Sequence, residues 1–550
     1  MPLAILVFFM IGLSPLSAFA EEEKSPEAGK EFHTTLFGEE SYVPARDRRS
    51  VTAVNFGIQW IPNGPSQMEM LPFGALYLWR NWDEDNRRFR GTFSGVVNDI
   101  DYTIGLRSLP NWSLIFTLDN FIAPIGRSEY VEGQRISASE LEWNYIFAGF
   151  GVGYRLPFIP FEQDSAINVF MTYEPGYRWF RGTSETSAQY GVPKDTYEGR
   201  IHGRIRWDAL VRNLMELPHR GFSTGGDVIH GHRSRWGAWG GPPLNTPDFK
   251  NEQTYVSASA YAVFASGLPF IESDKHRLIT SLYGGIGKDL DRFSAFRIPG
   301  RPTGFEWEAL SLPIMPGVAF NELFPRRYAI ASVTYRYEAL FFLYPYVTAT
   351  YSLVERLRFT PQGIKESTDS LPALGGGIVT GAPWKSQIEL NYSYNFGIFR
   401  DPGGPPPSMG GTEFLFFGRR SCDRLSILWK LFQRSAFLLQ LTVAAEFAHT
   451  QAAVLADRLF PPSHRLCLLV DRWTSLNKMR PQMGRSIQLG DREGRARVAG
   501  FGRQGDTGFD EVSEDSRVKI CPYDCTVCLK PECRAHGCER TGETMNDGYV

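Results

Sequence analysis

The sequence predicts an all-β protein: a transmembrane antiparallel β-barrel of about 16 strands with an interior loop, followed by an unrelated C-terminal tail. Three observations support this prediction. Segments with alternating apolar and polar residues recur through residues 51–418, an apolar run of export-signal length opens the chain, and all seven cysteines lie at Cys422 or later. A barrel exported through an oxidising periplasm is expected to avoid free thiols. The first cysteine therefore also marks a domain boundary.

The N-terminus has the pattern of a secretory signal peptide. Residues 4–13 (AILVFFMIGL) are apolar, and Ala18 and Ala20 form a small-residue cleavage site. The run is shorter than the roughly 20 residues that a membrane-spanning helix needs. We therefore predict a signal peptide over residues 1–20, a short polar periplasmic segment over 21–50, and a location in the bacterial cell outer membrane.

Period-two alternation supplies the expected barrel strands. In residues 387–398 the apolar Leu390 and Tyr392 are interleaved with Glu389 and Asn391, and the same pattern recurs over 166–173, 201–208, 332–338 and 347–353. Apolar residues of a membrane barrel face lipid and polar ones face the lumen. Within residues 388–398, we assign the even-numbered apolar residues, the last of which is Ile398, to the lipid face. The charged residues assigned to a wet lumen are Arg204, Arg206, Arg336, Glu338 and Glu389.

A soluble β-sandwich or propeller would alternate in the same way. Aromatic residues at expected strand ends favour the membrane barrel, because such barrels carry aromatic girdles at the two interfaces. The girdle candidates are Trp60, Trp79, Trp143, Trp179, Tyr344 and Tyr346. Gly149, Gly151 and Gly153 share one strand face, where they would permit a tight bend or the close approach of an interior loop.

Composition excludes several classes of function. The net charge of −2 and the pI near 6.5 give no nucleic-acid footprint. No apolar stretch after the signal is long enough for a transmembrane helix. No phosphate-binding glycine loop, dinucleotide fingerprint or His-Glu-x-x-His motif is present, so no cofactor is expected.

Two motifs resemble a known superfamily. The first is DALVRNLMELPHRGF (208–222), a strand-turn-strand segment in which Pro218 fixes φ and Gly221 can adopt a geometry closed to other residues. It is similar to the signature of the BamA/TamA-type outer-membrane protein insertase superfamily, also called bacterial surface antigen. The residues that match the signature are Arg212, Asn213, Pro218, Arg220 and Gly221. An ordinary hairpin would explain this segment alone.

The second motif is DRFSAFRIPGRPTGFEWEALSLP (291–313), which resembles the superfamily's long interior loop. The resemblance assigns Arg301, Gly304 and Phe305 to a latch at the loop tip, with spacing nearest to the barrel of bacterial patatin-like proteins. In the family this arginine pairs with acidic and aromatic groups on the barrel wall. The usual aspartate position is occupied by Thr350, so Glu338 and Glu389 are the lumen candidates for a partner.

The resemblance implies a barrel that assists protein insertion or translocation across the outer membrane. Its expected partners are outer-membrane lipid and unfolded outer-membrane or secreted proteins, with no nucleic acid. Family insertases carry periplasmic POTRA domains, and residues 21–50 are too few for one. The alternative is a passive or selective diffusion pore, which the lumen charges would line.

An enzymatic function is not expected. The sole hint of a hydrolase is His230 and His232 near Ser223 and Asp227, but one short segment does not give triad geometry. We assign those histidines to a loop. No patatin-type Gly-x-Ser-x-Gly motif is present.

The tail, residues 419–550, does not share the barrel pattern. Its apolar segment 425–459 is compatible with a helix, and its end is rich in cysteine. Three explanations remain open: a disordered or disulfide-linked appendage, a frameshift past the native stop, or a metal site. The weak metal candidates are Cys521, Cys525, Cys528 and Cys533, with His536 as a spare ligand.

Overall fold

The computed structural model describes the barrel region of the chain and part of the segment that precedes it. The described residues are 26–36, 38–62, 64, 69–82, 87–123, 125–157, 166–241, 252–271, 273–298, 307–319, 322–361, 363–382, 386–400 and 408–421. The predicted signal peptide, the loop residues Arg301, Gly304 and Phe305, and the tail with its cysteines lie outside them.

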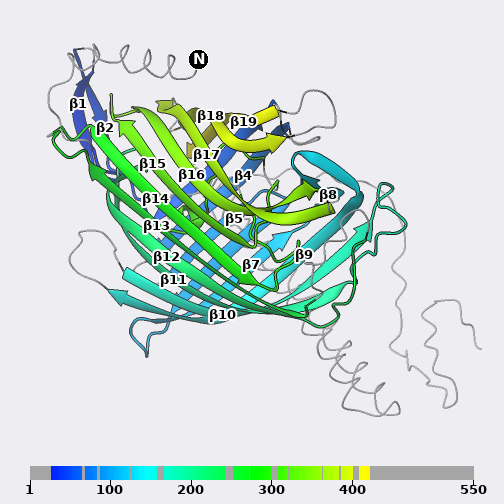
Figure 1. The fold of residues 1–550 in the computed structure, drawn as a ribbon. Helices are drawn as coiled ribbons and strands as arrows, with labels where there is room; N and C mark the ends of the chain where they lie inside the picture. Colours follow the sequence, from blue (N-terminus) through cyan, green and yellow to red (C-terminus); the bar gives the residue numbers. More distant parts are fainter. Residues whose placement is uncertain are drawn as a thin grey trace, which may run out of the picture. The chain divides into compact units, whose positions relative to one another are not determined.

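The described chain is almost entirely β-structure (Figure 1). The elements are β1 (Phe32–Leu36), β2 (Glu39–Val43), β3 (Ser50–Trp60), β4 (Met70–Trp82), β5 (Arg87–Phe93), β6 (Val97–Gly105), β7 (Trp112–Phe121), β8 (Arg127–Val131), β9 (Gln134–Pro157), β10 (Ala166–Gly182), β11 (Thr196–Arg212), β12 (Pro218–Arg233), β13 (Thr254–Gly267), β14 (His276–Lys288), α2 (Trp307–Ser311), β15 (Arg327–Tyr337), β16 (Leu343–Thr360), β17 (Gly363–Ala382), β18 (Ser386–Arg400) and β19 (Ser408–Ser421).

The strands form a closed barrel in which neighbours along the chain pair antiparallel. β19 pairs with β3 to complete the ring, with Phe414 opposite Trp60 and Ser421 opposite Ala53. β7 pairs directly with β9, and β8 pairs only with the first part of β9, so sixteen of the strands make the wall. The predicted antiparallel barrel of about 16 strands is confirmed.

The two ends of the barrel differ. β3 starts and β19 stops at one end, which we call the terminal end; the strand order places the 213–217 and 338–342 turns there too. The opposite end, which we call the loop end, carries the long connections 183–195, 234–253 and 289–326. A closed barrel leaves no sheet edge to pair with other chains.

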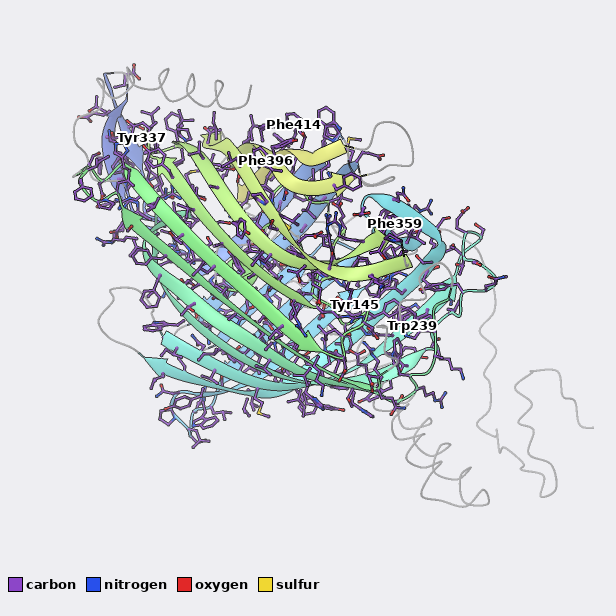
Figure 2. All side chains as sticks on the ribbon, in the orientation of Figure 1. Tyr145, Trp239, Tyr337, Phe359, Phe396 and Phe414 are labelled. Atoms are coloured by element: carbon purple, nitrogen blue, oxygen red, sulfur yellow. The ribbon has the colours of Figure 1, made fainter. Side chains whose placement is uncertain are left out.

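Side-chain alternation follows the predicted pattern along most strands. In β18 Leu390 is 54% exposed and Glu389 is 6% exposed. In β11 the outward Ile205 alternates with the buried Arg204 and Arg206. Figure 2 shows the outward aromatic side chains, including Phe396 and Phe414 on β18 and β19. Apolar residues thus cover the outside and polar residues fill the inside, the reverse of a soluble protein.

Several side chains depart from the predicted faces, four of them girdle candidates. Trp143 and Tyr344 are 2% and 0% exposed and point inward, Tyr346 lines the lumen cavity and donates to Glu389, and Trp79 packs against the inward Val51, Ala53 and Tyr77. Ile398, assigned to the lipid face, is completely buried because the register of β18 and β19 shifts between Asn395 and Phe399. A bulge of this kind moves later residues to the other face.

The three glycines on β9 allow close packing, although not of an interior loop. A Cβ at Gly149 would lie 2.1 Å from the hydroxyl oxygen of Thr117, and one at Gly151 would lie 1.9 Å from the carbonyl oxygen of Met171. These contacts come from the neighbouring strands β7 and β10. In the described part of the chain, no helix has the length and apolar character required to cross a membrane.

Candidate functional site: the loop-filled lumen

The connection between β14 and β15 turns back into the barrel. Its described parts are residues 289–298, 307–319 and 322–326. The short helix α2 packs against β11, β12 and β13, and Ile298 is fully buried. The sequence predicted an interior loop here, and its described parts lie against the lumen face of the wall.

The first part of the loop, which follows β14, is anchored by Asp291. Its Oδ2 accepts a hydrogen bond of 2.5 Å from Nη1 of Arg233, and Nε of Arg233 donates to Glu198 at 2.9 Å. Nε of Arg178 donates to the same carboxylate at 2.7 Å. All four side chains are at most 4% exposed. A buried charge of this kind is tolerated only when it is paired and hydrogen-bonded.

Phe293, two residues further on, supplies an apolar anchor. Its ring centroid lies 4.8 Å from that of Phe180, 5.0 Å from Trp239 and 5.4 Å from Trp143. The aromatic residues of β9 and β10 therefore receive the loop. Burying such a ring contributes about 1.5–3 kcal/mol.

Helix α2 is held by two arginines of β11. Glu308 accepts from Nη2 of Arg206 at 2.9 Å and from Nη1 of Arg204 at 3.2 Å. Arg204 also pairs with Asp101 of β6, and Arg206 pairs with Asp227 of β12. The sequence predicted that these arginines line a wet lumen; the structure instead uses them to bind the loop.

The last part of the loop, which precedes β15, contacts the strands near the barrel closure. Glu322 pairs with Arg400 of β18 at 2.7 Å. Glu413 of β19 accepts from the backbone nitrogen of Gly317 at 2.7 Å and from Nε2 of Gln59 of β3 at 2.9 Å. One carboxylate therefore connects the loop to both strands of the closing pair.

The strand-turn motif lies at the terminal end, between β11 and β12. Asn213 is fully buried, and its Oδ1 accepts from the backbone nitrogens of Met215 and Leu217 at 3.1 and 3.0 Å. Its Nδ2 donates to Oε1 of Glu338 at 3.1 Å. Arg212 pairs with Asp208 at 2.8 Å on the preceding strand. Asn213 thus fixes the turn and joins it to the end of β15.

The other three motif residues have separate contacts. The carbonyl of Pro218 accepts from Arg336 at 2.5 Å, and Arg220 pairs with Glu27 at 3.0 Å. Gly221 has φ of +98°, and a Cβ there would lie 2.2 Å from the carbonyl oxygen of Ala209. Only glycine fits this position without strain.

The segment before β3 docks on this turn. The backbone nitrogen of Ala28 donates to the carbonyl of Arg212 at 2.9 Å, and Arg48 pairs with Glu216 at 2.9 Å. Hydrogen bonding to Lys30 lowers the pKa of Glu27, so its carboxylate remains charged beside Arg220. β11 and β12 are the eighth and ninth of the sixteen strands counted from β3. The segment therefore runs from the first strand towards the opposite wall, and Figure 1 shows β1 and β2 beyond the strand ends.

Both lumen candidates for a partner of Arg301 have partners among the described residues. Glu338 pairs with Arg336 at 2.9 Å, and Glu389 accepts from the hydroxyl of Tyr346 at 2.5 Å. Because Arg301, Gly304 and Phe305 lie outside the described residues, the latch stays a prediction.

The residues that suggested a hydrolase do not form a catalytic site in the structure. Ser223 is buried on the inner face of β12, whereas His230 and His232 are exposed on its outer face. The sequence predicted a loop for these two histidines, but they lie on strand β12. Asp227 is bound to His202 and Arg206. Within the described ranges, no group of three or more His, Cys, Asp or Glu residues could hold a metal.

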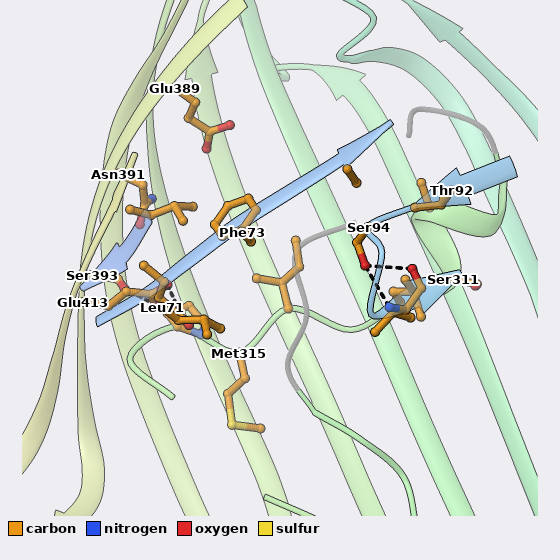
Figure 3. A pocket seen from close by; sticks show the side chains of 18 of the residues that line it. Leu71, Phe73, Thr92, Ser94, Ser311, Met315, Glu389, Asn391, Ser393 and Glu413 are labelled. Atoms are coloured by element: carbon orange, nitrogen blue, oxygen red, sulfur yellow. Dashed lines mark hydrogen bonds between the residues drawn. The ribbon is translucent and has the colours of Figure 1, made fainter. Parts of the chain in front are cut away.

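Beside the loop the lumen keeps a cavity of about 1120 Å³. It reaches from Arg127, near the loop end, to Pro218 and Arg336 at the terminal end. Figure 3 shows Leu71 and Phe73 of β4 on one side of it. The lining is mixed, with apolar side chains on β4 and the loop and polar ones on β18 and β19.

The sequence did not reveal the residues that anchor the loop. Asp291 and Glu308 lie within the motif that resembles the interior loop, but their partners are 58 and 102 positions away. No local spacing links them. The one available signal was the excess of inward arginines on β11, which predicts acidic partners somewhere in the lumen.

No family model and no curated protein matches the chain. Among solved structures, it is similar to BamA from Haemophilus ducreyi lacking POTRA domains 1–3, with a TM-score of 0.40 and 9% identity over 73% of this chain and 77% of that one. It is also similar to CdiB from Acinetobacter baumannii (0.40, 11%, 72% and 66%) and CdiB from Escherichia coli (0.40, 10%, 72% and 67%). Identities this low do not transfer any residue's role to this chain.

Proposed function

We propose that this protein is an outer-membrane barrel that assists the insertion or translocation of proteins, with the 289–326 loop controlling the lumen. The observation that carries the proposal is the anchoring of that loop by arginine–carboxylate pairs at Asp291, Glu308 and Glu322. A permanent plug needs only packing. Charged anchors can exchange partners, which suits a loop that moves.

The outer surface supports the membrane location. Val169 and Met171 of β10, Ile205 of β11 and Val333 of β15 are each more than 40% exposed. An apolar exterior of this extent requires lipid or another apolar cover. The predicted export signal agrees with this location. The proposal includes two features of the resemblance. The loop motif has the spacing of the barrels of patatin-like proteins, and residues 21–50 do not form a POTRA domain.

A second function, a diffusion pore, is favoured by one observation. The cavity beside the loop extends from the loop end to the terminal end, and so offers a path for small solutes. In this alternative the loop narrows the lumen permanently and has no gating role.

Conductance in planar bilayers distinguishes the two functions. For the wild-type chain we expect low and fluctuating conductance. Glu308→Gln leaves Arg204 and Arg206 with one carboxylate fewer, and Arg301→Ala removes the predicted latch; both should increase the conductance. Glu185→Gln, an exposed change at the loop end, is the control. A large, steady wild-type conductance that none of these changes affects would indicate a pore.

Insertion itself is tested in vesicles that contain the purified protein. An unfolded eight-stranded outer-membrane barrel is added, and its folding is followed by the mobility shift of the folded form on gels. The wild-type protein should accelerate this folding relative to empty vesicles. Equal rates with and without the protein would contradict the insertase function.

A further inference from the structure

The first part of β9 forms a hairpin with β8 at the loop end of the barrel. Residues 134–141 of β9 pair with β8, whereas later residues of the same strand pair with β7. The hairpin turns over two residues, Glu132 and Gly133, which have φ of +52° and +85°. Two positive φ values are typical of the tight turns that join twisted hairpin strands. We call residues 127–141 the strap.

The tip of the strap reaches the opposite side of the barrel. The carboxylate of Glu132 accepts from Nε of Arg358 at 2.8 Å and from the backbone nitrogen of Phe359 at 3.3 Å, both on β16. A Cβ at Gly133 would lie 2.9 Å from Cβ of Arg400, the last residue of β18. Counted from β3, β9 is the sixth strand of the wall, and β16 and β18 are the thirteenth and fifteenth. The strap therefore spans the mouth at the loop end, and Figure 1 shows β8 beside the end of β16.

The strap also binds the interior loop, through Arg292. Nη1 of Arg292 donates to the carbonyl of Ser139 at 2.9 Å, and Nη2 donates to the carbonyl of Arg127 at 2.6 Å. Its Nε lies 2.7 Å from Oε1 of Glu129. All three nitrogens of this guanidinium therefore contact the strap. Arg292 follows Asp291, which anchors the loop to the wall, so the strap and the wall hold the same part of the loop.

The lumen cavity meets the strap at the loop end. Ser128 and Tyr130 of the strap line the cavity, together with Phe324 of the interior loop. The strap is thus in contact with the mouth, the cavity and the loop at once. A movement of the strap would change all three.

The two attachments of the strap differ in burial. In the pair at the tip, the side chain of Arg358 is 40% exposed and that of Glu132 is 9% exposed. In the pair with the interior loop, the side chains of Arg292 and Glu129 are 2% and 7% exposed. Water competes for an exposed pair, whereas a buried charge that loses its partner is costly. The tip is therefore expected to detach first, with the strap still bound to the loop.

We propose that the strap is a lid on the loop-end mouth, with Glu132 and Arg358 as its releasable catch and Arg292 as its link to the interior loop. When the catch opens, the strap leaves β16 and the linked part of the loop loosens with it. This inference rests on the proposed control of the lumen by the interior loop. It adds the segment that holds the loop at the mouth.

Hydrogen exchange of the full chain in octyl glucoside, read by mass spectrometry, tests the catch. In Glu132→Gln we expect amides in residues 127–141 and 291–298 to exchange about two- to five-fold faster, as the loss of a part-exposed ion pair predicts. Arg358→Gln should have the same effect. The double variant should exchange no faster than either single variant, because all three lack the same pair.

Two further variants make the result specific. Glu185→Gln, an exposed change in the neighbouring connection at the loop end, should exchange as the wild type does in both segments. Arg292→Gln removes the link. In that background, adding Glu132→Gln should still accelerate exchange in residues 127–141 but should no longer affect residues 291–298. If Arg292→Gln does not fold, the catch variants still decide the proposal.

Three outcomes would overturn the proposal. The first is unchanged exchange of residues 127–141 in Glu132→Gln. The second is faster exchange of the strap with unchanged exchange of residues 291–298, which would mean that the strap does not hold the loop. The third is a double variant in which the two single effects multiply, which would mean that the two residues act separately. Exchange is measured without a client protein, so a failure here is distinct from a failure of the insertion assay.

Discussion

Individual residues fix the turn between β11 and β12. Asn213 saturates the turn amides and reaches Glu338, while Gly221 lets β12 start beside β11. The motif residues therefore serve one local geometry through different interactions. Their positions, but not these partners, could be predicted from the sequence.

Replacement of Gly221 by alanine should destabilise the barrel. The new Cβ would meet the carbonyl oxygen of Ala209 at 2.2 Å in a backbone with φ of +98°. We expect a loss of about 1–3 kcal/mol in unfolding free energy, measured by urea unfolding in phospholipid vesicles. Gly237→Ala is the matched control, because nothing lies within 4 Å of its Cβ position. Equal stability of the two variants would contradict the strain argument.

At the scale of elements, two segments outside the wall are attached to it by charges. The interior loop uses Asp291, Glu308 and Glu322, and the segment before β3 uses Arg48 and Glu216. In the lumen these charges act beside apolar contacts, such as those of Phe293 and Ile298 with the wall. The part-exposed pair of Arg48 and Glu216 can open locally, whereas the buried pairs of the loop are costly to break without another partner.

Loss of the Arg48–Glu216 pair should release the segment before β3. Glu216 is 7% exposed and accepts from Arg48, with Arg46 3.8 Å away. In Glu216→Gln we expect limited proteolysis within residues 26–49 to be roughly two- to ten-fold faster, as the loss of a part-buried ion pair predicts. Glu39→Gln, exposed on β2, should be cleaved at the wild-type rate. Unchanged cleavage of Glu216→Gln would mean that the backbone hydrogen bonds suffice.

At the scale of the whole molecule, the barrel is inverted relative to a soluble protein. The outside is apolar, while the inside holds linked ion pairs such as those of Arg206 with Glu308 and Asp227. The arginine is buried and both carboxylates are largely so, and each charge therefore depends on its partner. The apolar outside requires an apolar cover, and the loop fills part of the inside.

A charge on the outer face tests the membrane location. Leu390 of β18 is 54% exposed and is the fifth of the strand's 15 residues. Leu390→Arg should cost about 1–4 kcal/mol in unfolding free energy in phospholipid vesicles, because arginine on the lipid face costs most at the bilayer midplane and less towards the interfaces. Gln189→Arg, in an exposed loop, should cost almost nothing. If Leu390→Arg is equally harmless, the outer face of β18 is not in contact with lipid.

The sequence alone predicted the period-two strands, the turns between them and, through these, an antiparallel barrel of about sixteen strands. These features are local, since alternation and turn residues act within ten to twenty positions. Tertiary structure decided which inward charges pair, why Ile398 turns inward after a register shift, and why Trp143 faces the loop. It also placed Arg127 and Arg297 beside the rings of Phe121 and Trp143. Those outcomes depend on strand register and on contacts between residues from about 20 to more than a hundred positions apart, which no local pattern encodes.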